Sequence, residues 1–122
     1  MRKWMIVIDI DGDASTYMSS SDSLNLANCS EILWAGLYWG AKITTSTTNY
    51  ASRSNVKLKV NNNAYQVLTA DQTLSYSGTV SYFCFKNITS IVQSAGIKAR
   101  FTVADLVTQT NSTNLWGGWT IV

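Results

Sequence analysis

Apolar and polar residues alternate with a period of two along much of the chain, and this alternation limits the possible folds more than any other feature. In residues 56–60, Val56, Leu58 and Val60 are separated by two lysines. Residues 97–103 repeat the pattern, with basic and hydroxyl residues between the apolar ones. Because successive side chains of a strand point to opposite faces, each segment predicts a strand with one buried face.

Other segments are apolar on both sides, which predicts strands in the middle of a sheet. In residues 32–39, Leu37 and Trp39 lie on one face, while Trp34 and Tyr38 lie on the other. The remaining predicted strands are residues 4–10, 65–69, 80–85 and 118–122.

One segment has helical spacing instead. The apolar residues of segment 88–95 fall on one side of a helix, Asn87 or Thr89 can cap its start, and Gly96 can end it. Short strands separated by turn residues, without helical crossovers, predict an all-β antiparallel β-sandwich with this one short helix. We interpret residues 1–122 as a single domain, since the chain length fits one hydrophobic core.

The composition excludes several classes of function. The chain contains no histidine, which excludes Ser-His-Asp catalysis and histidine-ligated zinc. Its net charge is +2 with 13% charged residues, without the basic clusters that nucleic-acid binding requires. Glu31 is the only glutamate, and no carboxylate pair suggests a glycosidase. No apolar run approaches the roughly 18 residues of a membrane span. We therefore expect a non-enzymatic protein that neither binds nucleic acid nor spans a membrane.

Residues 56–62, 82–92 and 96–103 together resemble the galactose-binding-like jelly roll. In that superfold one strand ends in an Asn-Gly-type turn, and a later strand leads into an Asp-(Val/Ile)-Thr helical turn. A glycine then precedes an alternating strand. Here Asn87 stands where aspartate is usual, and asparagine can also cap a helical turn. The resemblance implies jelly-roll topology for the sandwich.

A second resemblance rests on residues 28–41, which contain Ala-Gly-Leu-Tyr-Trp-Gly, together with residues 9–13 and 117–122. These segments are similar to a module of large secreted bacterial surface proteins of the Bacteroidetes type, including adhesin-like and gliding-motility proteins. The resemblance implies an extracellular or cell-surface location, a fragment of a longer protein, and other domains of that protein as partners. Asp9 ends the first apolar run too early for a signal peptide, so we expect none in this chain.

Asp9, Asp11 and Asp13 form the one cluster of carboxylates in the sequence. Alternating aspartates in a turn can offer oxygen ligands to Ca²⁺. The pattern is not that of an EF-hand, because Ala14 and Ser20 stand where glycine and glutamate would be needed. A structural calcium site and a solvated turn are the two hypotheses for this segment.

Cys29 and Cys84 are the two cysteines of the chain. A disulfide between them would close a long loop and stabilise the fold by roughly 3–4 kcal/mol. The alternative is a pair of separate thiols, which are common in protein cores.

Trp116, Trp34 and Tyr38 are the candidate sugar-binding residues, because aromatic rings can stack on the C–H face of a sugar. The alternative is that these rings pack inside the sandwich. We expect a structural or adhesive module of a cell-surface protein. One alternative is a carbohydrate-binding module that recognises glycans. Another is a filament or fibre subunit, in which copies of the chain pair through the edge of the last strand.

Overall fold

The computed structural model describes residue 10 and residues 19–43, 50–76, 81–107 and 117–122. The strand predicted over residues 4–10 lies almost wholly outside these ranges. A short 3-10 turn spans Tyr50–Ser52, and one α-helix, α1, spans Thr89–Ala95. The strands are β1 (Ser19–Asn25), β2 (Gly36–Lys42), β3 (Asn55–Val60), β4 (Gln66–Thr69), β5 (Gln72–Tyr76), β6 (Ser81–Asn87), β7 (Lys98–Ala104) and β8 (Gly117–Ile121).

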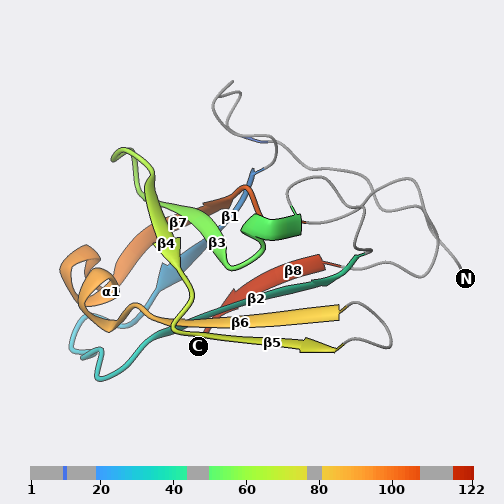
Figure 1. Cartoon of the computed structure of the whole chain (residues 1–122). Coiled ribbons are helices and arrows are strands. Elements are labelled where there is room, and N and C mark those ends of the chain that lie inside the picture. The colour runs from blue at the N-terminus through green and yellow to red at the C-terminus, as the bar shows by residue number, and fades with distance from the viewer. Residues whose placement is uncertain (1–9, 11–18, 44–49, 77–80, 108–116) are drawn as a thin grey trace, which may run out of the picture.

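The strands form two four-stranded antiparallel sheets that face each other (Figure 1). The first sheet has the order β1-β7-β3-β4, and the second has the order β5-β6-β2-β8. The helix α1 lies at one end of the sandwich (Figure 1). The expected all-β antiparallel sandwich with one short helix is confirmed. Most connections cross from one sheet to the other, in keeping with the expected jelly-roll wrapping.

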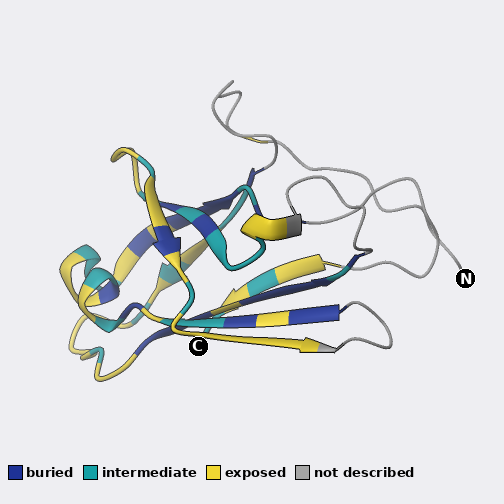
Figure 2. Ribbon diagram, viewed as in Figure 1, coloured by how far each residue is buried: buried dark blue, intermediate teal, exposed yellow. Residues whose placement is uncertain are grey.

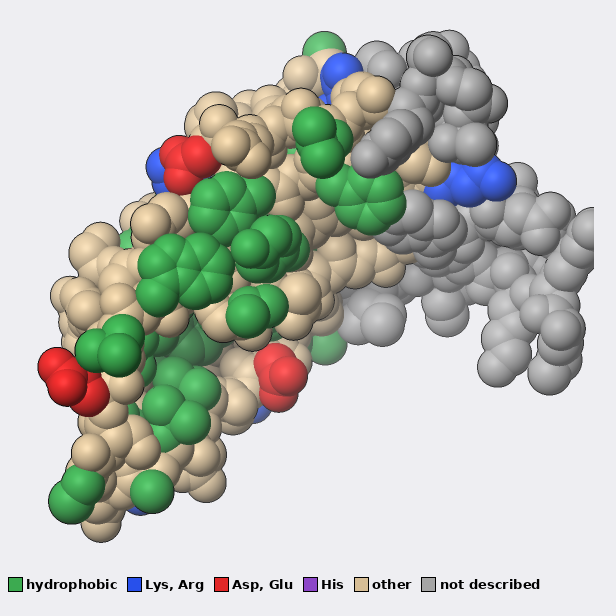
Figure 3. Space-filling view, turned by 90° about the horizontal axis from the view of Figure 1, so that it is seen from below, with side chains coloured by type: hydrophobic (Ala, Val, Ile, Leu, Met, Phe, Trp, Pro, Cys, Tyr) green, Lys and Arg blue, Asp and Glu red, His purple; other side chains and the backbone are tan. Residues whose placement is uncertain are grey.

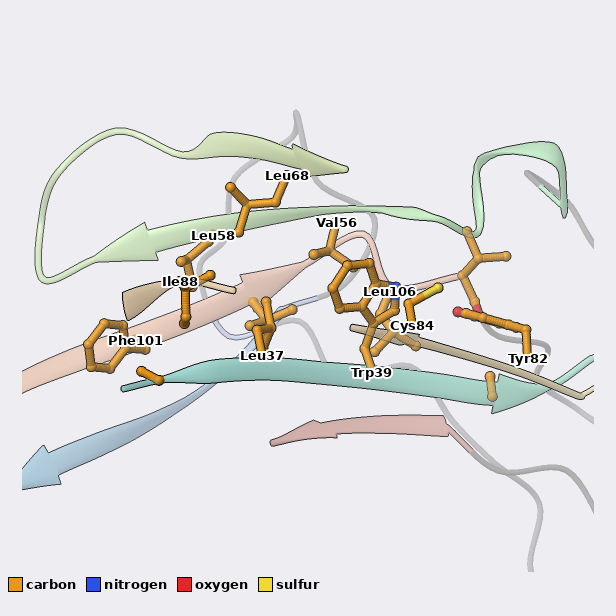
Figure 4. Packing of buried hydrophobic residues seen from close by; sticks show 14 of the residues in the cluster. Leu37, Trp39, Val56, Leu58, Leu68, Tyr82, Cys84, Ile88, Phe101 and Leu106 are labelled. Carbon is orange, nitrogen blue, oxygen red and sulfur yellow. The ribbon is translucent and has the colours of Figure 1, made fainter. Parts of the chain in front are cut away.

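The core lies between the two sheets and follows from the alternation in the sequence. Leu37 and Trp39 of β2 point inward toward Leu58 of β3 (Figure 4), and Val103 of β7 is buried in the same cluster. Figure 2 shows that buried residues alternate with exposed ones along the strands. Each large apolar side chain buried in this way stabilises the fold by roughly 1.5–3 kcal/mol. The predicted one-sided strands therefore supply the wall opposite β2.

Two large aromatic residues of the core also have their polar atoms bonded. The indole N–H of Trp39 donates to the carbonyl oxygen of Arg53 at 3.1 Å. The hydroxyl of Tyr82 donates to the carbonyl oxygen of Val107 at 2.7 Å. A buried polar atom without a partner would cost about 1–3 kcal/mol, so these two bonds let the rings be buried without that penalty.

The strand predicted over residues 32–39 begins later than expected, at Gly36. The backbone N–H of Ala35 donates to the hydroxyl of Thr89 at 3.0 Å, and its carbonyl accepts the N–H of Ile88 at 3.0 Å. These bonds tie Ala35 to the start of the helix, so its backbone does not pair with a neighbouring strand.

The sequence pattern did not predict β1 and β5. In β1 the sole apolar residue is Leu24, and the rest of the strand is Ser, Asp and Asn. In β5 the hydroxyl residues Thr73 and Ser75 alternate with longer side chains. Both strands lie at an edge of their sheet and pair with one neighbour among the described strands. An edge strand buries less of each side chain, so the alternation that identifies a strand is weak there.

The helix predicted over residues 88–95 is confirmed as α1. The side-chain oxygen of Asn87 accepts the N–H of Thr89 at 3.0 Å and its hydroxyl at 2.7 Å. Gly96 ends the helix with φ of 90°, and its N–H donates to the carbonyl of Val92 at 3.1 Å. That left-handed conformation favours glycine. Within the described ranges, no helix combines the length and apolar character needed to cross a membrane.

Candidate binding face

The outer side of the second sheet carries a cluster of hydrophobic side chains. Tyr38 of β2 points away from the core, since the residues on either side of it are buried. The antiparallel register places Tyr38 opposite Phe85 of β6, and Leu74 of β5 opposite Phe83 of β6. Figure 3 shows hydrophobic side chains gathered on this side of the molecule. We call this surface the aromatic face, and its residues are Trp34, Tyr38, Leu74, Phe83 and Phe85.

These side chains are open to solvent to a degree that is unusual for large apolar residues. Trp34 is 46% exposed, Tyr38 40% and Phe83 43%, whereas Trp39 in the core is 2% exposed. Single exposed apolar residues are ordinary on protein surfaces, but contiguous apolar patches mark interaction sites. The aromatic face is a contiguous patch rather than a set of single residues, because three of its rings contact one another.

Three of the rings form a connected platform. The rings of Trp34 and Phe85 are nearly parallel, with centroids 6.0 Å apart and an angle of 13° between the planes. The ring of Tyr38 is tilted by 41° to that of Phe85, with centroids 5.1 Å apart. Both arrangements are within the favourable range for aromatic pairs, so the rings support one another's positions.

Gly36 makes this platform possible. A Cβ atom at Gly36 would lie 2.4 Å from Cη2 of Trp34 and 2.8 Å from Cε2 of Phe85. Both distances are too short for any side chain, so the two rings occupy the space that a residue other than glycine would fill.

A hollow lies beside the platform, where two glycines face each other across neighbouring strands. Gly40 of β2 pairs with Gly118 of β8, and a Cβ atom at Gly118 would meet no atom within 4 Å. The side chains of Tyr38 and Phe83 line the hollow together with Thr120. Its volume is about 350 Å³, and we call it the glycine hollow.

The aromatic face is nearly free of charge. Among the described residues, Lys42 at the end of β2 is the one charged side chain at an outward position of the four strands. Neutral polar groups are present instead. Within the described part of the chain, the indole N–H of Trp34 and the hydroxyls of Tyr38 and Thr120 have no hydrogen-bond partner.

An ion pair lies at one end of the second sheet. The ammonium group of Lys86 lies 3.0 Å from Oδ1 of Asp71, and the backbone N–H of Asn87 donates to Oδ2 of Asp71 at 2.8 Å. The bond from Asn87 and the contact with Lys86 together hold the pKa of Asp71 below its ordinary value. Asp71 is therefore already paired with groups of its own sheet.

A neutral surface of this kind suits a neutral ligand that has both apolar faces and hydroxyl groups. The π faces of aromatic rings carry negative charge density and attract the slightly positive C–H groups of a pyranose ring. The unpartnered N–H and hydroxyl groups can bind the sugar hydroxyls at the ring edges. Among the residues that the structure describes, a charged ligand would find no counter-charge at the centre of the face.

The structure brings two of the three predicted sugar-binding residues together and leaves the third undescribed. Trp34 and Tyr38 lie on the aromatic face, bridged by Phe85, and Trp116 lies outside the described residues. Phe83, Phe85 and Leu74 also belong to this surface, although the sequence pattern did not identify them as binding residues. Alternation within residues 80–85 does place Phe83 and Phe85 on one side, but it does not show that β6 is the neighbour of β2.

The predicted calcium ligands Asp9, Asp11 and Asp13 lie outside the described residues. In the parts of the chain that the structure describes, no group of three or more Cys, Asp or Glu side chains could hold a metal ion.

The disulfide considered for Cys29 and Cys84 is not formed, and both thiols are free. Cys29 is exposed between β1 and β2, while Cys84 is buried in β6 with its side chain toward the core. Burial raises the pKa of the Cys84 thiol, and its contacts with Thr73 and Arg53 oppose that shift in part. The two residues therefore differ in environment, and Cys84 is a packing residue of the second sheet.

Comparison of the chain with protein-family models, with curated proteins and with solved structures gives no match.

Proposed function

We propose that this chain is a non-enzymatic adhesive module, part of a longer protein at the cell surface, and that it binds neutral carbohydrate through the aromatic face. The observation that carries the proposal is the uncharged platform on the outside of a sheet, in which the exposed rings of Trp34 and Tyr38 flank the half-buried ring of Phe85. Hydrophobic patches on stable folds mark binding surfaces, and this patch combines ring faces with neutral hydrogen-bonding groups.

The proposal of a binding rather than a catalytic role rests on the state of the described carboxylates. Asp71 is bound by Lys86, and Asp105 lies 3.0 Å from the ammonium group of Lys57. Each of these two carboxylates is paired with a cation, whereas glycoside hydrolysis uses a pair of carboxyl groups that flank the scissile bond. Carbohydrate recognition needs none of these groups, since stacking and neutral hydrogen bonds carry it.

The test is a binding screen of the intact chain against immobilised neutral and charged glycans. Trp34→Ala removes one ring of the platform and is expected to lower the affinity for a neutral glycan about tenfold, the equivalent of roughly 1.4 kcal/mol. Tyr65→Ala is the matched control, since Tyr65 lies just before β4, next to Lys59 of β3 in the first sheet. Its affinity is expected to equal that of the wild type.

Two outcomes would contradict the proposal. One is the absence of binding to every neutral glycan at millimolar concentration. The other is an equal loss of affinity in Trp34→Ala and Tyr65→Ala. A stable dimer that forms through Trp34 and buries the aromatic face would likewise count against carbohydrate as the ligand.

A second candidate function is self-assembly through β8. This strand pairs with β2 on one side and has no other partner among the described strands. Exposed strand edges recruit further strands from other chains. Light scattering tests this candidate, which predicts masses of several protomers that fall when charged residues are added after Val122. A single-protomer mass over the whole concentration range contradicts it.

A further inference from the structure

The aromatic face contains two separate places where a ligand ring could sit. Two rings of the platform, those of Trp34 and Phe85, lie over Gly36 at the start of β2. The glycine hollow is bordered by Gly40, four residues farther along the same strand, and it is open above Gly118. At about 3.4 Å per residue, the two places are roughly 14 Å apart. Tyr38, the third ring of the platform, contacts Phe85 and also lines the hollow.

The two places differ in shape. At Gly36 the space above the backbone is filled by ring atoms, which gives a raised surface. At Gly118 the space is empty, and the rings of Tyr38 and Phe83 stand beside it as walls. A flat ligand ring can therefore stack on the platform, while the hollow takes a ring between its walls with the Thr120 hydroxyl at the rim.

We propose that the glycine hollow is a second sugar subsite, and that the ligand is an extended linear polysaccharide which runs along β2 from the platform to the hollow. This inference rests on the proposed function. A single pyranose ring is too short to reach both places, whereas a chain of consecutive rings reaches both. Tyr38 supports the sugar units between the two. The face then recognises a stretch of neutral chain rather than one terminal sugar.

The absence of charge along this path fits the same ligand. Every described outward position between Gly36 and Gly40, and from Gly118 to Thr120 on β8, carries a glycine or a neutral side chain. The volume of the hollow, about 350 Å³, leaves room for a whole ring rather than a single substituent. The path therefore needs a ligand that is neutral and made of rings.

The experiment measures affinity against chain length. The probes are β-1,4-linked and β-1,3-linked gluco-oligosaccharides and β-1,4-linked N-acetylglucosamine oligosaccharides, each from two to six units. For the wild type, affinity in the series that binds is expected to rise from the disaccharide to the hexasaccharide. Gly118→Leu fills the hollow and is expected to lower the affinity for the hexasaccharide about 3–10-fold, which is the effect of losing one ring contact. The affinity for the disaccharide is expected to fall much less.

Two further variants keep the test decisive. Phe83→Ala removes the opposite wall and is expected to give the same length-dependent loss, so the result stands even where Gly118→Leu lowers stability. Val67→Leu enlarges an exposed strand side chain on the first sheet and serves as the control.

The inference is overturned when the wild type binds the disaccharide as tightly as the hexasaccharide. It is also overturned when neither Gly118→Leu nor Phe83→Ala changes the dependence on chain length. In both cases Trp34→Ala would still lower affinity, and the proposed function would stand. When no probe binds the wild type and Trp34→Ala changes nothing in the wider glycan screen, the proposed function itself fails.

Discussion

The two outer faces of the sandwich differ in how their side chains are used. On the first sheet, Lys57 forms an ion pair with Asp105, and the ammonium group of Lys59 lies 4.8 Å from the centre of the Tyr65 ring. On the second sheet, Trp34 and Tyr38 present rings and polar atoms that have no partner for hydrogen bonding in the described structure.

The first sheet extends this pattern of internal contacts. The guanidinium group of Arg100 in β7 donates to the hydroxyl of Ser21 in β1 at 2.6 Å. Like Lys57 and Lys59, this cation therefore has a contact within the first sheet. Such contacts on an exposed surface contribute little stability but keep the face polar and hydrated. The comparison shows that the charged side chains on the outer side of the first sheet are paired with one another or with neighbouring groups, as expected for a surface in contact with water. The second sheet has a face whose exposed rings require another explanation, and ligand binding supplies one.

The largest expected effect tests whether the two faces belong to one cooperative unit. Leu58 lies in the core between the sheets and is fully buried. Leu58→Ala is expected to lower the free energy of unfolding by about 3 kcal/mol, because the cavity cannot close completely. Urea unfolding followed by tryptophan fluorescence and by circular dichroism should give one shared midpoint. Separate midpoints would mean that the two sheets, and their faces, unfold independently.

A smaller effect separates the two glycines of the hollow. A Cβ atom at Gly40 would lie 2.5 Å from the carbonyl oxygen of Tyr82, so Gly40→Ala forces the strands apart. We expect it to destabilise the fold by about 1–3 kcal/mol. Gly118→Ala adds its methyl group to open space and is expected to change stability by less than about 0.5 kcal/mol. Thermal unfolding of the two variants measures both changes in stability. Equal destabilisation would mean that the space above Gly118 is not open as described.

The smallest effect concerns the ion pair at the end of the second sheet. The pKa of Asp71 is lowered in the folded state, so its contribution to stability is present above the ordinary pKa of 3.8 and is lost as the pH falls through the folded value. Asp71→Asn is expected to lower stability at neutral pH and to flatten the dependence of stability on pH in this acidic range. Unfolding midpoints between pH 7 and pH 2 measure this difference. Parallel pH profiles for the two proteins would contradict the role given to Asp71.

The sequence predicts the inward face of this molecule better than its outward face. Alternation in residues 56–60 and 97–103 identifies Leu58 and Phe101 as core residues, because one of their two faces is plainly polar. Residues 32–39 carry apolar side chains on both faces, so alternation alone does not decide whether Leu37 or Tyr38 points inward.

The pairing of strands in the folded protein decides which of the two side chains points inward. The neighbours of β2 are β6 and β8, which are distant in sequence, and the pairing of Tyr38 with Phe85 emerges only from the register of β2 and β6. The edge strands β1 and β5 escaped prediction for a related reason, since most of their side chains are polar and each is fixed by pairing with one neighbour among the described strands. The platform could therefore be suspected from Trp34 and Tyr38, but Phe83, Phe85 and the hollow could not.

The most direct test of the central claim follows the indole N–H signals of the protein by NMR during titration with a neutral hexasaccharide. The indole N–H of Trp34 has no partner in the described structure, while that of Trp39 is bonded to Arg53 in the core. We predict that the Trp34 signal shifts in a saturable manner while the Trp39 signal stays in place. A Trp34 signal unchanged by every neutral hexasaccharide that the protein binds would show that the aromatic face is not the binding surface.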